Sequence, residues 1–220
     1  LRIMRGLRFA SSKGFSIEKN TLFWCNALAE NLKNVAYERI FAELKKREIS
    51  ACAIADISSL MGYQEFDELC LKHNISPLFG MKITLEDNEV NLYILNEKGY
   101  ENLIKLVSLG FTEGFYKKPR VDKELLKKHH EGLIALSACL AGEIPRNLTQ
   151  NDYETAKKVA LEYRDIFGEN NYFIEIQDHG LPEQKQVLPQ LVRLAREMDI
   201  PLVATNDCHY LEPTDAEEQE

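Results

Sequence analysis

Apolar residues in this chain fall into two patterns that alternate from about residue 21 onward. Short continuous apolar runs are typical of buried strands, whereas apolar positions three and four residues apart are typical of amphipathic helices. The short runs predict strands at 21–25, 51–55, 77–83, 90–95, 132–136, 172–176 and 200–204. The helical spacing predicts helices at 37–47, 66–73, 103–111, 122–126, 152–167 and 187–198. This alternation predicts an α/β fold with a largely parallel sheet.

Two of the predicted helices begin with a residue that can cap them. Asp122 and Asp152 stand immediately before the helical patterns, and Gly168 follows the second one. An aspartate side chain accepts hydrogen bonds from the free N–H groups of a first helical turn, and glycine suits the residue that ends a helix. We therefore expect both aspartates to act as N-caps.

Polar side chains recur where the predicted strands end. They are Asp56, Cys139, His179, Asp207 and His209. In a barrel of parallel strands these ends share one mouth, so residues far apart in sequence meet there. An open doubly wound sheet also gathers its strand ends, so the pattern leaves closure of the sheet undecided. Asp207 and His209 are two residues apart, and in extended backbone such residues point to the same side.

Composition narrows the function classes. A net charge of −8 over 220 residues argues against unaided binding of nucleic acid, because phosphate binding depends on clustered lysine and arginine. The five cysteines form no C-x-x-C pair, which is typical of reduced thiols in a cytoplasmic protein. No apolar stretch is long enough to span a membrane, so no membrane partner is expected. The chain ends inside an acidic, helix-like run, and we expect it to be a fragment of a longer protein.

The strand-end residues are of the types that bind a divalent metal. Aspartate, histidine and cysteine thiolate all ligate Zn²⁺, and such a metal can activate water to hydrolyse a phosphoester. Only two of the five histidines lie at strand ends, which is few for a hydrolase that uses several metals. Structural alternatives stay open for Asp207 as a cap of the following segment and for Cys139 as a buried, inert thiol.

The other three histidines have simpler interpretations. His73 falls in the last turn of a predicted helix, where a cation suits the helix dipole. His129 and His130 follow two lysines in a solvated basic stretch. The chain has no P-loop, nucleophile elbow, G-x-G-x-x-G or H-E-x-x-H motif. A small basic group at 117–120 is a weak candidate for contact with DNA.

Four segments carry a family resemblance. They are GFYKKPRVD at 114–122, LSACLAGEIP at 136–145, FIEIQDHGLPEQ at 173–184 and TNDCHYL at 205–211. Together they closely resemble the N-terminal PHP (polymerase and histidinol phosphatase) domain of the alpha subunit of bacterial DNA polymerase III. The resemblance implies a distorted (β/α)7 barrel, TIM-like and of the PHP type. We expect residues 21–220 to form this domain, preceded by an N-terminal extension at 1–20.

The resemblance also implies that part of the family's metal site is lost. Only Cys139, Asp207 and His209 match ligand positions, with Asp56 and His179 as polar neighbours. The remaining ligand positions hold residues that the family pattern does not have there, at Phe23, Cys25, Ile57, Lys82 and Asn91. The family's glutamate is replaced by a lysine, whose charge repels a divalent cation. No tightly bound metal is therefore expected, and Lys82 is expected to balance Asp207 or Asp56.

Three functions follow from this resemblance as expectations. The first is a catalytically inactive scaffold that docks the other domains of a replicative DNA-directed DNA polymerase or a proofreading exonuclease subunit. The parent polymerase would use Mg²⁺ and bind DNA, whereas this fragment needs no cofactor. The second is a residual phosphoesterase or 3′-5′ exonuclease with one metal at Cys139, Asp207 and His209. The third is a free-standing interaction module.

Overall fold

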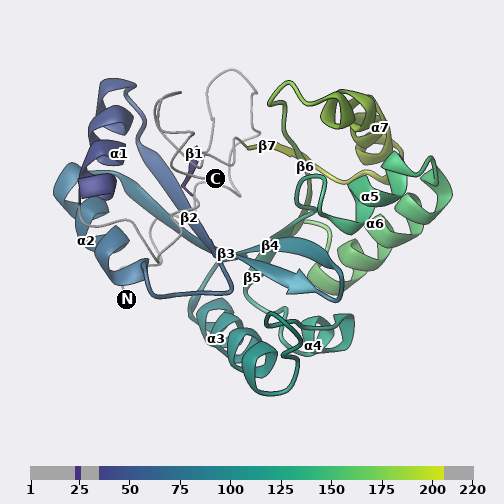
Figure 1. The fold of residues 1–220 in the computed structure, drawn as a ribbon, viewed down its shortest axis with the longest axis horizontal. Helices are drawn as coiled ribbons and strands as arrows, with labels where there is room; N and C mark the ends of the chain where they lie inside the picture. Colours follow the sequence, from purple (N-terminus) through teal and green to yellow (C-terminus); the bar gives the residue numbers. More distant parts are fainter. Residues whose placement is uncertain (1–22, 26–34, 206–220) are drawn as a thin grey trace.

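The computed structural model describes residues 23–25 and 35–205 of the chain (Figure 1). The strands are β1 (Phe23–Cys25), β2 (Ala51–Ile57), β3 (Ser76–Leu85), β4 (Asn88–Ile94), β5 (Leu133–Leu136), β6 (Tyr172–Ile176) and β7 (Leu202–Ala204). The helices are α1 (Val35–Lys46), α2 (Tyr63–His73), α3 (Glu97–Thr112), α4 (Lys123–Lys128), α5 (Glu143–Thr149), α6 (Tyr153–Phe167) and α7 (Pro182–Met198).

The strands form one seven-stranded sheet in sequence order, β1 to β7. Neighbours are parallel except around β4, which runs antiparallel to both β3 and β5. Figure 1 shows this sheet curled into an open trough, with the helices on its outside. A parallel pair needs a crossover that returns the chain to the same end, and helices on one side supply it. The predicted α/β fold with a distorted barrel is confirmed.

The two faces of the curled sheet have different chemistry. Strand partners fix which side chains share a face, because successive side chains alternate. The face toward the helices is mostly apolar and largely buried, with Ile54, Met81, Leu92 and Ile174 all at 0% exposure. The opposite face, here called the inner face, is defined by Gly80, Lys82, Asn91, Glu175 and Thr205.

The inner face is tightly packed where β3 meets β4. Gly80 lies opposite Tyr93 in the register, and a Cβ atom at position 80 would come within 2.3 Å of the Tyr93 ring. Only glycine leaves room for the aromatic ring at this position. The Tyr93 ring therefore packs against the backbone of β3 at Gly80, and any side chain at position 80 would displace it.

The predicted helices and strands are present, and both predicted caps are confirmed. Asp122 accepts a hydrogen bond from the backbone N–H of Leu125, and Asp152 accepts one from Thr155. Helix α5 was not predicted, because it is only seven residues long and has Pro145 in its first turn. None of the described helices is both long and apolar enough to cross a membrane.

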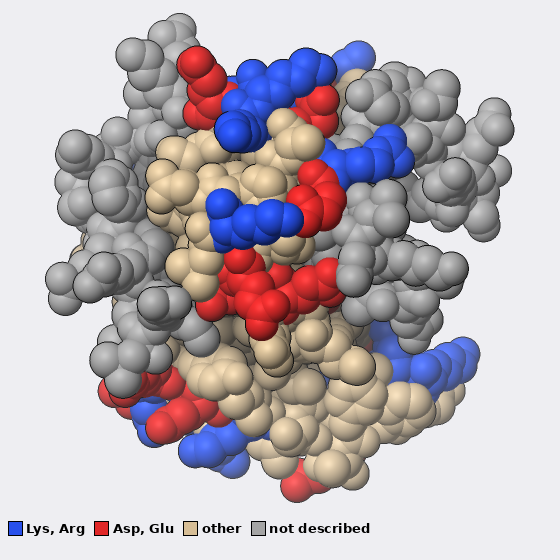
Figure 2. Space-filling view, turned by 90° about the vertical axis from the view of Figure 1, so that its left-hand side faces the viewer, with Lys and Arg blue, Asp and Glu red and all other residues tan. Residues whose placement is uncertain are grey.

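The outer surface of α1 and α2 mixes both signs of charge. Lys72 pairs with Glu38, and Glu43 pairs with Lys46 at 3.0 Å and with Arg47 at 3.3 Å. Figure 2, which faces this side, shows acidic and basic side chains next to one another. No single-sign patch of described residues covers this side, so it lacks the concentrated positive charge that phosphate backbones require.

Candidate functional site

A buried carboxylate forms the centre of the inner face. Glu175 in β6 is only 1% exposed. Its carboxylate accepts hydrogen bonds from Asn91 Nδ2 at 2.8 Å and from Gln177 Nε2 at 3.1 Å. The hydroxyl of Thr205 donates to the same carboxylate, and the Glu175 backbone N–H donates to Ser137 Oγ at 2.9 Å. Residues in β4 and directly after β5, β6 and β7 thus meet at one acid.

The donors around Glu175 explain how a charged group is tolerated there. Hydrogen bonds to an ionised acceptor are stronger than neutral ones and offset the loss of hydration. Sequence reasoning did not single out Glu175. A signal was present nonetheless, because Glu175 is the one charged residue in the otherwise apolar run at 172–176.

Lys82 brings a positive charge to the same face. It is the strand partner of Ile57 on one side and of Asn91 on the other. Its side chain is 12% exposed, and its Nζ lies 4.0 Å from a carboxylate oxygen of Glu89. This lysine occupies the position that the family resemblance assigns to a glutamate ligand. A cation there opposes the binding of a divalent metal.

Asp56 lies on the other side of the sheet. Its register partner is Met81, so it shares the helix-facing side and not the face of Lys82. The predicted pairing of Lys82 with Asp56 is therefore wrong, and the other predicted partner, Asp207, lies outside the described residues. Asp56 is 3% exposed, and within the described part of the chain neither carboxylate oxygen has a hydrogen-bond partner.

The isolation of Asp56 changes its acidity. Burial raises the pKa of Asp56 to about 7, because the charged form loses hydration without gaining a partner. Helix α2 packs on this side of the sheet. Burial, and then the charge of Asp56, raise the pKa of Tyr63 in α2 well above its usual value. Asp56 is thus a feature of the helix-facing layer and does not belong to the inner face.

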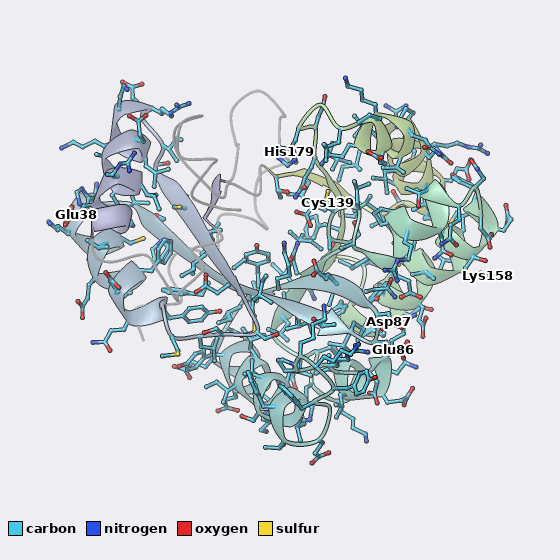
Figure 3. The ribbon with its side chains drawn as sticks, viewed as in Figure 1. Glu38, Glu86, Asp87, Cys139, Lys158 and His179 are labelled. Carbon is cyan, nitrogen blue, oxygen red and sulfur yellow. The ribbon has the colours of Figure 1, made fainter. Side chains whose placement is uncertain are left out.

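Cys139 and His179 are brought together by a third residue. Figure 3 shows both labelled side chains close to β6, on the inner side of the curled sheet. Gln184, in the first turn of α7, accepts the backbone N–H of His179 at 2.7 Å through Oε1. Its Nε2 lies 3.0 Å from His179 Nδ1 and 3.3 Å from Cys139 Sγ. Gln184 is 3% exposed, and sequence reasoning gave it no role although it stands in the 173–184 motif.

The structure describes only some of the other predicted site positions. Asp207 and His209 lie outside the described residues, as do the side chains of Phe23 and Cys25. Ile57, at one of the predicted lost ligand positions, is 49% exposed at the end of β2. Among residues 38–205, no group of three or more histidine, cysteine or acidic side chains is arranged to hold a metal ion.

The donor set that the structure describes does not suit a divalent metal. The inner face offers an ammonium at Lys82 and an amide at Asn91, and its one central carboxylate is engaged by three donors. Of the histidines outside the site, His73 is where it was predicted, whereas His129 and His130 are half-buried and not fully solvated. His73 in the last turn of α2 lies 3.3 Å from Glu38.

Two protein-family models match segments of this chain. The model of the PHP domain matches residues 34–179. A second model, described as "Probable RNA and SrmB- binding site of polymerase A", matches residues 14–47. Phe23 and Cys25 therefore fall before the PHP match and inside the other one, so their assignment as lost ligands stays a prediction.

Curated relatives are DNA polymerase III alpha subunits. The protein from Treponema pallidum is 41% identical over 198 residues, which cover 83% of this chain and 17% of the relative. The protein from Deinococcus radiodurans is 40% identical over 184 residues, which cover 76% of this chain and 14% of the relative. The chain thus spans less than a fifth of the length of these relatives.

Solved structures share the fold at low sequence identity. A "putative metal-dependent phosphoesterase" from Bifidobacterium adolescentis aligns with a TM-score of 0.53 and 14% identity, covering 88% of this chain and 90% of that one. An amidohydrolase from Chromobacterium violaceum aligns with a TM-score of 0.51 and 10% identity, covering 80% and 82%. At these identities the likeness extends to the fold alone.

Proposed function

The chain belongs to the PHP domain family, and from this premise we propose that it is the PHP domain of a bacterial replicative DNA polymerase, acting as a metal-free scaffold. The DNA-directed DNA polymerase activity, the Mg²⁺ it requires and most of the contact with DNA then belong to other parts of a longer cytoplasmic protein. The domain corresponds to residues 21–220, with 1–20 as an extension.

Lys82 is the observation that carries this proposal. Two unit charges of the same sign repel by about 4 kcal/mol at 4 Å in an effective dielectric near 20, and a divalent ion doubles that figure. The Lys82 side chain as a whole is only 12% exposed on the inner face, so solvent screens this repulsion only in part. A metal with this neighbour would need a stronger ligand set than the chain offers at Ile57 and Asn91.

The hydrogen bonds to Glu175 also support the proposal, because they show how the inner face can be stable without a metal. A barrel whose metal ligands are lost has polar groups left in its interior, and these are costly unless they are hydrogen-bonded. Amide and hydroxyl donors from Asn91, Gln177 and Thr205 meet that need without a metal. The inner face can therefore hold the strands together as a structural element.

An exposed aromatic surface supports the docking part of the proposal. Phe111, Phe115 and Tyr116, here called the aromatic corner, are 50%, 58% and 64% exposed. The Phe111 and Phe115 rings stack with centroids 6.4 Å apart, and the Arg120 guanidinium lies 5.2 Å from the Tyr116 ring centroid. Clustered aromatic and arginine side chains are typical of interface centres. The chain spans only 17% of its Treponema relative, so we assign the corner to another domain of the same polymerase chain.

The binding of divalent metal is the test of the scaffold. The purified chain is dialysed against Mn²⁺ or Zn²⁺, its metal content is measured, and phosphoesterase activity is assayed. We expect less than one metal per chain and no activity. Lys82→Glu restores a carboxylate and is expected to raise the metal content, whereas the matched Lys82→Gln removes only the positive charge. Stoichiometric metal in the unmodified chain, with activity abolished by Asp207→Ala, would establish the hydrolase instead.

Two alternatives are separated by other observations. A proofreading exonuclease subunit is a second candidate partner, and binding of the two purified proteins tests it directly. A free-standing interaction module predicts that the gene ends soon after Glu220. The polymerase proposal predicts a long continuation that carries palm-domain carboxylates.

A second function is favoured by the match at 14–47, whose family description names RNA binding. Residues 14–47 would then contact RNA, and the strand at 23–25 would not correspond to a strand that carries metal ligands. Binding of labelled single-stranded RNA to the full chain, with and without Lys19 and Lys33 of this segment changed to alanine, tests this idea. The mixed charge on the described face of α1 and α2 favours the scaffold over this function.

A further inference from the structure

The orientation of the Gln184 amide is fixed by a donor that cannot be reassigned. The backbone N–H of His179 always donates, and it lies 2.7 Å from Gln184 Oε1. Rotating the amide by half a turn would place an NH₂ group against this N–H, so that two donors would face each other and the hydrogen bond would be lost. Gln184 Oε1 is therefore the acceptor, and Nε2 faces the imidazole.

This orientation decides which imidazole nitrogen carries the proton. Gln184 Nε2 is a donor only, and it lies 3.0 Å from His179 Nδ1. Nδ1 must accept this hydrogen bond, so in the neutral ring it has no proton. The single ring proton is then on Nε2. The second N–H of the same amide points toward Cys139 Sγ at 3.3 Å, which makes that sulfur an acceptor.

We propose that Gln184 is a positioning residue that holds His179 in the tautomer protonated on Nε2, so that neither ring nitrogen is available to a metal. The Nδ1 lone pair is taken by Gln184, and Nε2 carries a hydrogen. Metal-binding histidines have the opposite arrangement, in which an acceptor takes the proton of one nitrogen and the other nitrogen ligates. His179 is thus a hydrogen-bond donor toward an oxygen acceptor, such as a carboxylate.

The environment of Gln184 makes this arrangement rigid. The residue is 3% exposed at the start of α7, and it joins the segment after β6 to Cys139 in the segment after β5. Its carbonyl and both its N–H groups are directed at named partners, so no rotation of the side chain preserves all three contacts. This inference deepens the scaffold proposal, because it gives a reason in the described residues why the histidine of the 173–184 motif does not bind metal.

The tautomer is measurable by long-range ¹⁵N–¹H correlation NMR of the ¹⁵N-labelled chain at pH 8, with His179→Gln used to assign the signal. In the unmodified chain we expect Nδ1 to give the shift of an unprotonated nitrogen and Nε2 that of a protonated one. Gln184→Glu keeps an acceptor for the backbone N–H and offers a second oxygen to Nδ1–H. In that variant we expect the two shifts to exchange and Nε2 to respond to added Zn²⁺.

The result that overturns the proposal is a protonated Nδ1 in the unmodified chain, or unchanged shifts in a folded Gln184→Glu variant. If the variant fails to fold, the tautomer of the unmodified chain decides alone. The outcome is separate from that of the scaffold proposal. Metal bound through Cys139, Asp207 and His209 would overturn the scaffold while leaving the His179 shifts, and hence the role of Gln184, unchanged.

Discussion

Two buried carboxylates on opposite faces of the same sheet differ in nearly everything except burial. Glu175 and Asp56 are 1% and 3% exposed. Glu175 accepts hydrogen bonds from three side chains, whereas Asp56 has no hydrogen-bond partner among the described residues. The first acid is built into a network across strands, and the second faces an apolar helical layer. A buried acid therefore stabilises or destabilises the fold according to the donors around it.

The largest expected effect is on the inner face. Glu175→Ala leaves the Asn91, Gln177 and Thr205 donors without their shared acceptor and opens a small cavity. We expect a loss of about 3–5 kcal/mol in the free energy of unfolding, measured by urea denaturation. Glu175→Gln is the matched control, because it keeps the volume and one acceptor, and it should lose about 1–2 kcal/mol. Equal losses in the two variants would show that volume, and not the network, matters.

For Asp56 we expect the opposite: its negative charge lowers the free energy of unfolding, so its removal should stabilise the fold. Its pKa is about 7 in the folded protein, above the ordinary value of 3.8, so the folded state holds the proton more tightly than the unfolded state. This contribution to stability is complete below about pH 4, falls as the pH rises toward 7 and then levels off. A shift of about three pKa units corresponds to about 4 kcal/mol.

Removal of this charge tests the comparison directly. Asp56→Asn should raise the free energy of unfolding at pH 8 by about 2–4 kcal/mol, less whatever the buried amide itself costs. The difference between variant and unmodified chain should disappear near pH 4. Asp165→Asn, at an exposed aspartate whose side chain is 73% accessible, is the matched control and should show no such pH dependence. A flat difference between pH 4 and pH 8 for Asp56→Asn would mean that Asp56 is not a buried, isolated acid.

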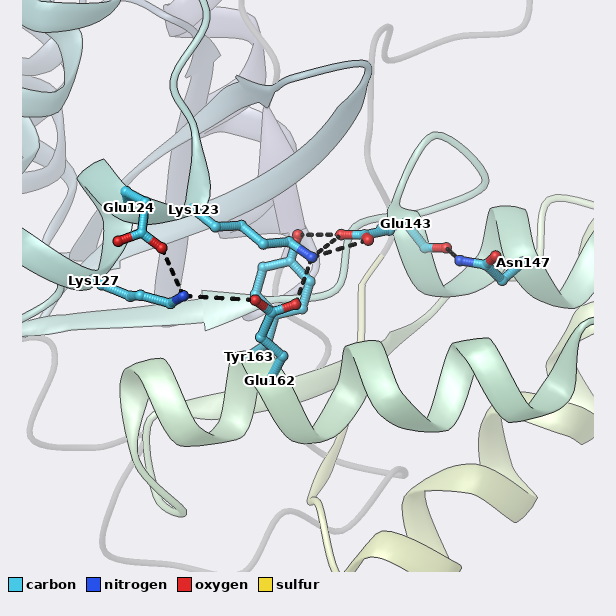
Figure 4. A network of polar contacts seen from close by, with 7 residues as sticks. All are labelled: Lys123, Glu124, Lys127, Glu143, Asn147, Glu162 and Tyr163. Atoms are coloured by element: carbon cyan, nitrogen blue, oxygen red, sulfur yellow. Dashed lines mark hydrogen bonds and ion pairs between the residues drawn. The ribbon is translucent and has the colours of Figure 1, made fainter.

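A smaller effect on the free energy of unfolding is expected at the ion pairs that Lys123 forms with Glu143 and Glu162. Lys123 of α4 contacts Glu143 at 3.0 Å and Glu162 at 2.7 Å, and Glu143 also accepts from the Tyr163 hydroxyl (Figure 4). Burial alone would lower the pKa of Lys123, but hydrogen bonds to Glu162 and Glu143 raise it overall. Lys123→Met should cost about 1 kcal/mol, and the cost should shrink in 1 M NaCl. A cost that does not depend on salt would point to packing of the lysine stem instead.

The site was predictable from sequence only where residue type and strand position suffice. Asp56 was placed with the mouth residues because it ends an apolar run, yet its register partner puts it on the helix-facing side. A shift of one position along a strand exchanges the two faces, and the apolar run at 51–55 contains no alternation that would reveal the face. Gln184 was overlooked for a related reason, since a glutamine in a helical first turn is ordinarily exposed.

The sequence by itself determined the order of strands and helices and the capped helix ends. Through the family resemblance it also predicts that Ile57, Lys82 and Asn91 replace metal ligands. These depend on local periodicity and on residue chemistry, which one chain carries in full. Only the tertiary structure decided that Glu175 is surrounded by donors, that Asp56 has none among the described residues, and that Gln184 contacts both His179 and Cys139. Those facts arise from contacts between residues far apart in the chain, and the curling of the sheet sets which of them meet.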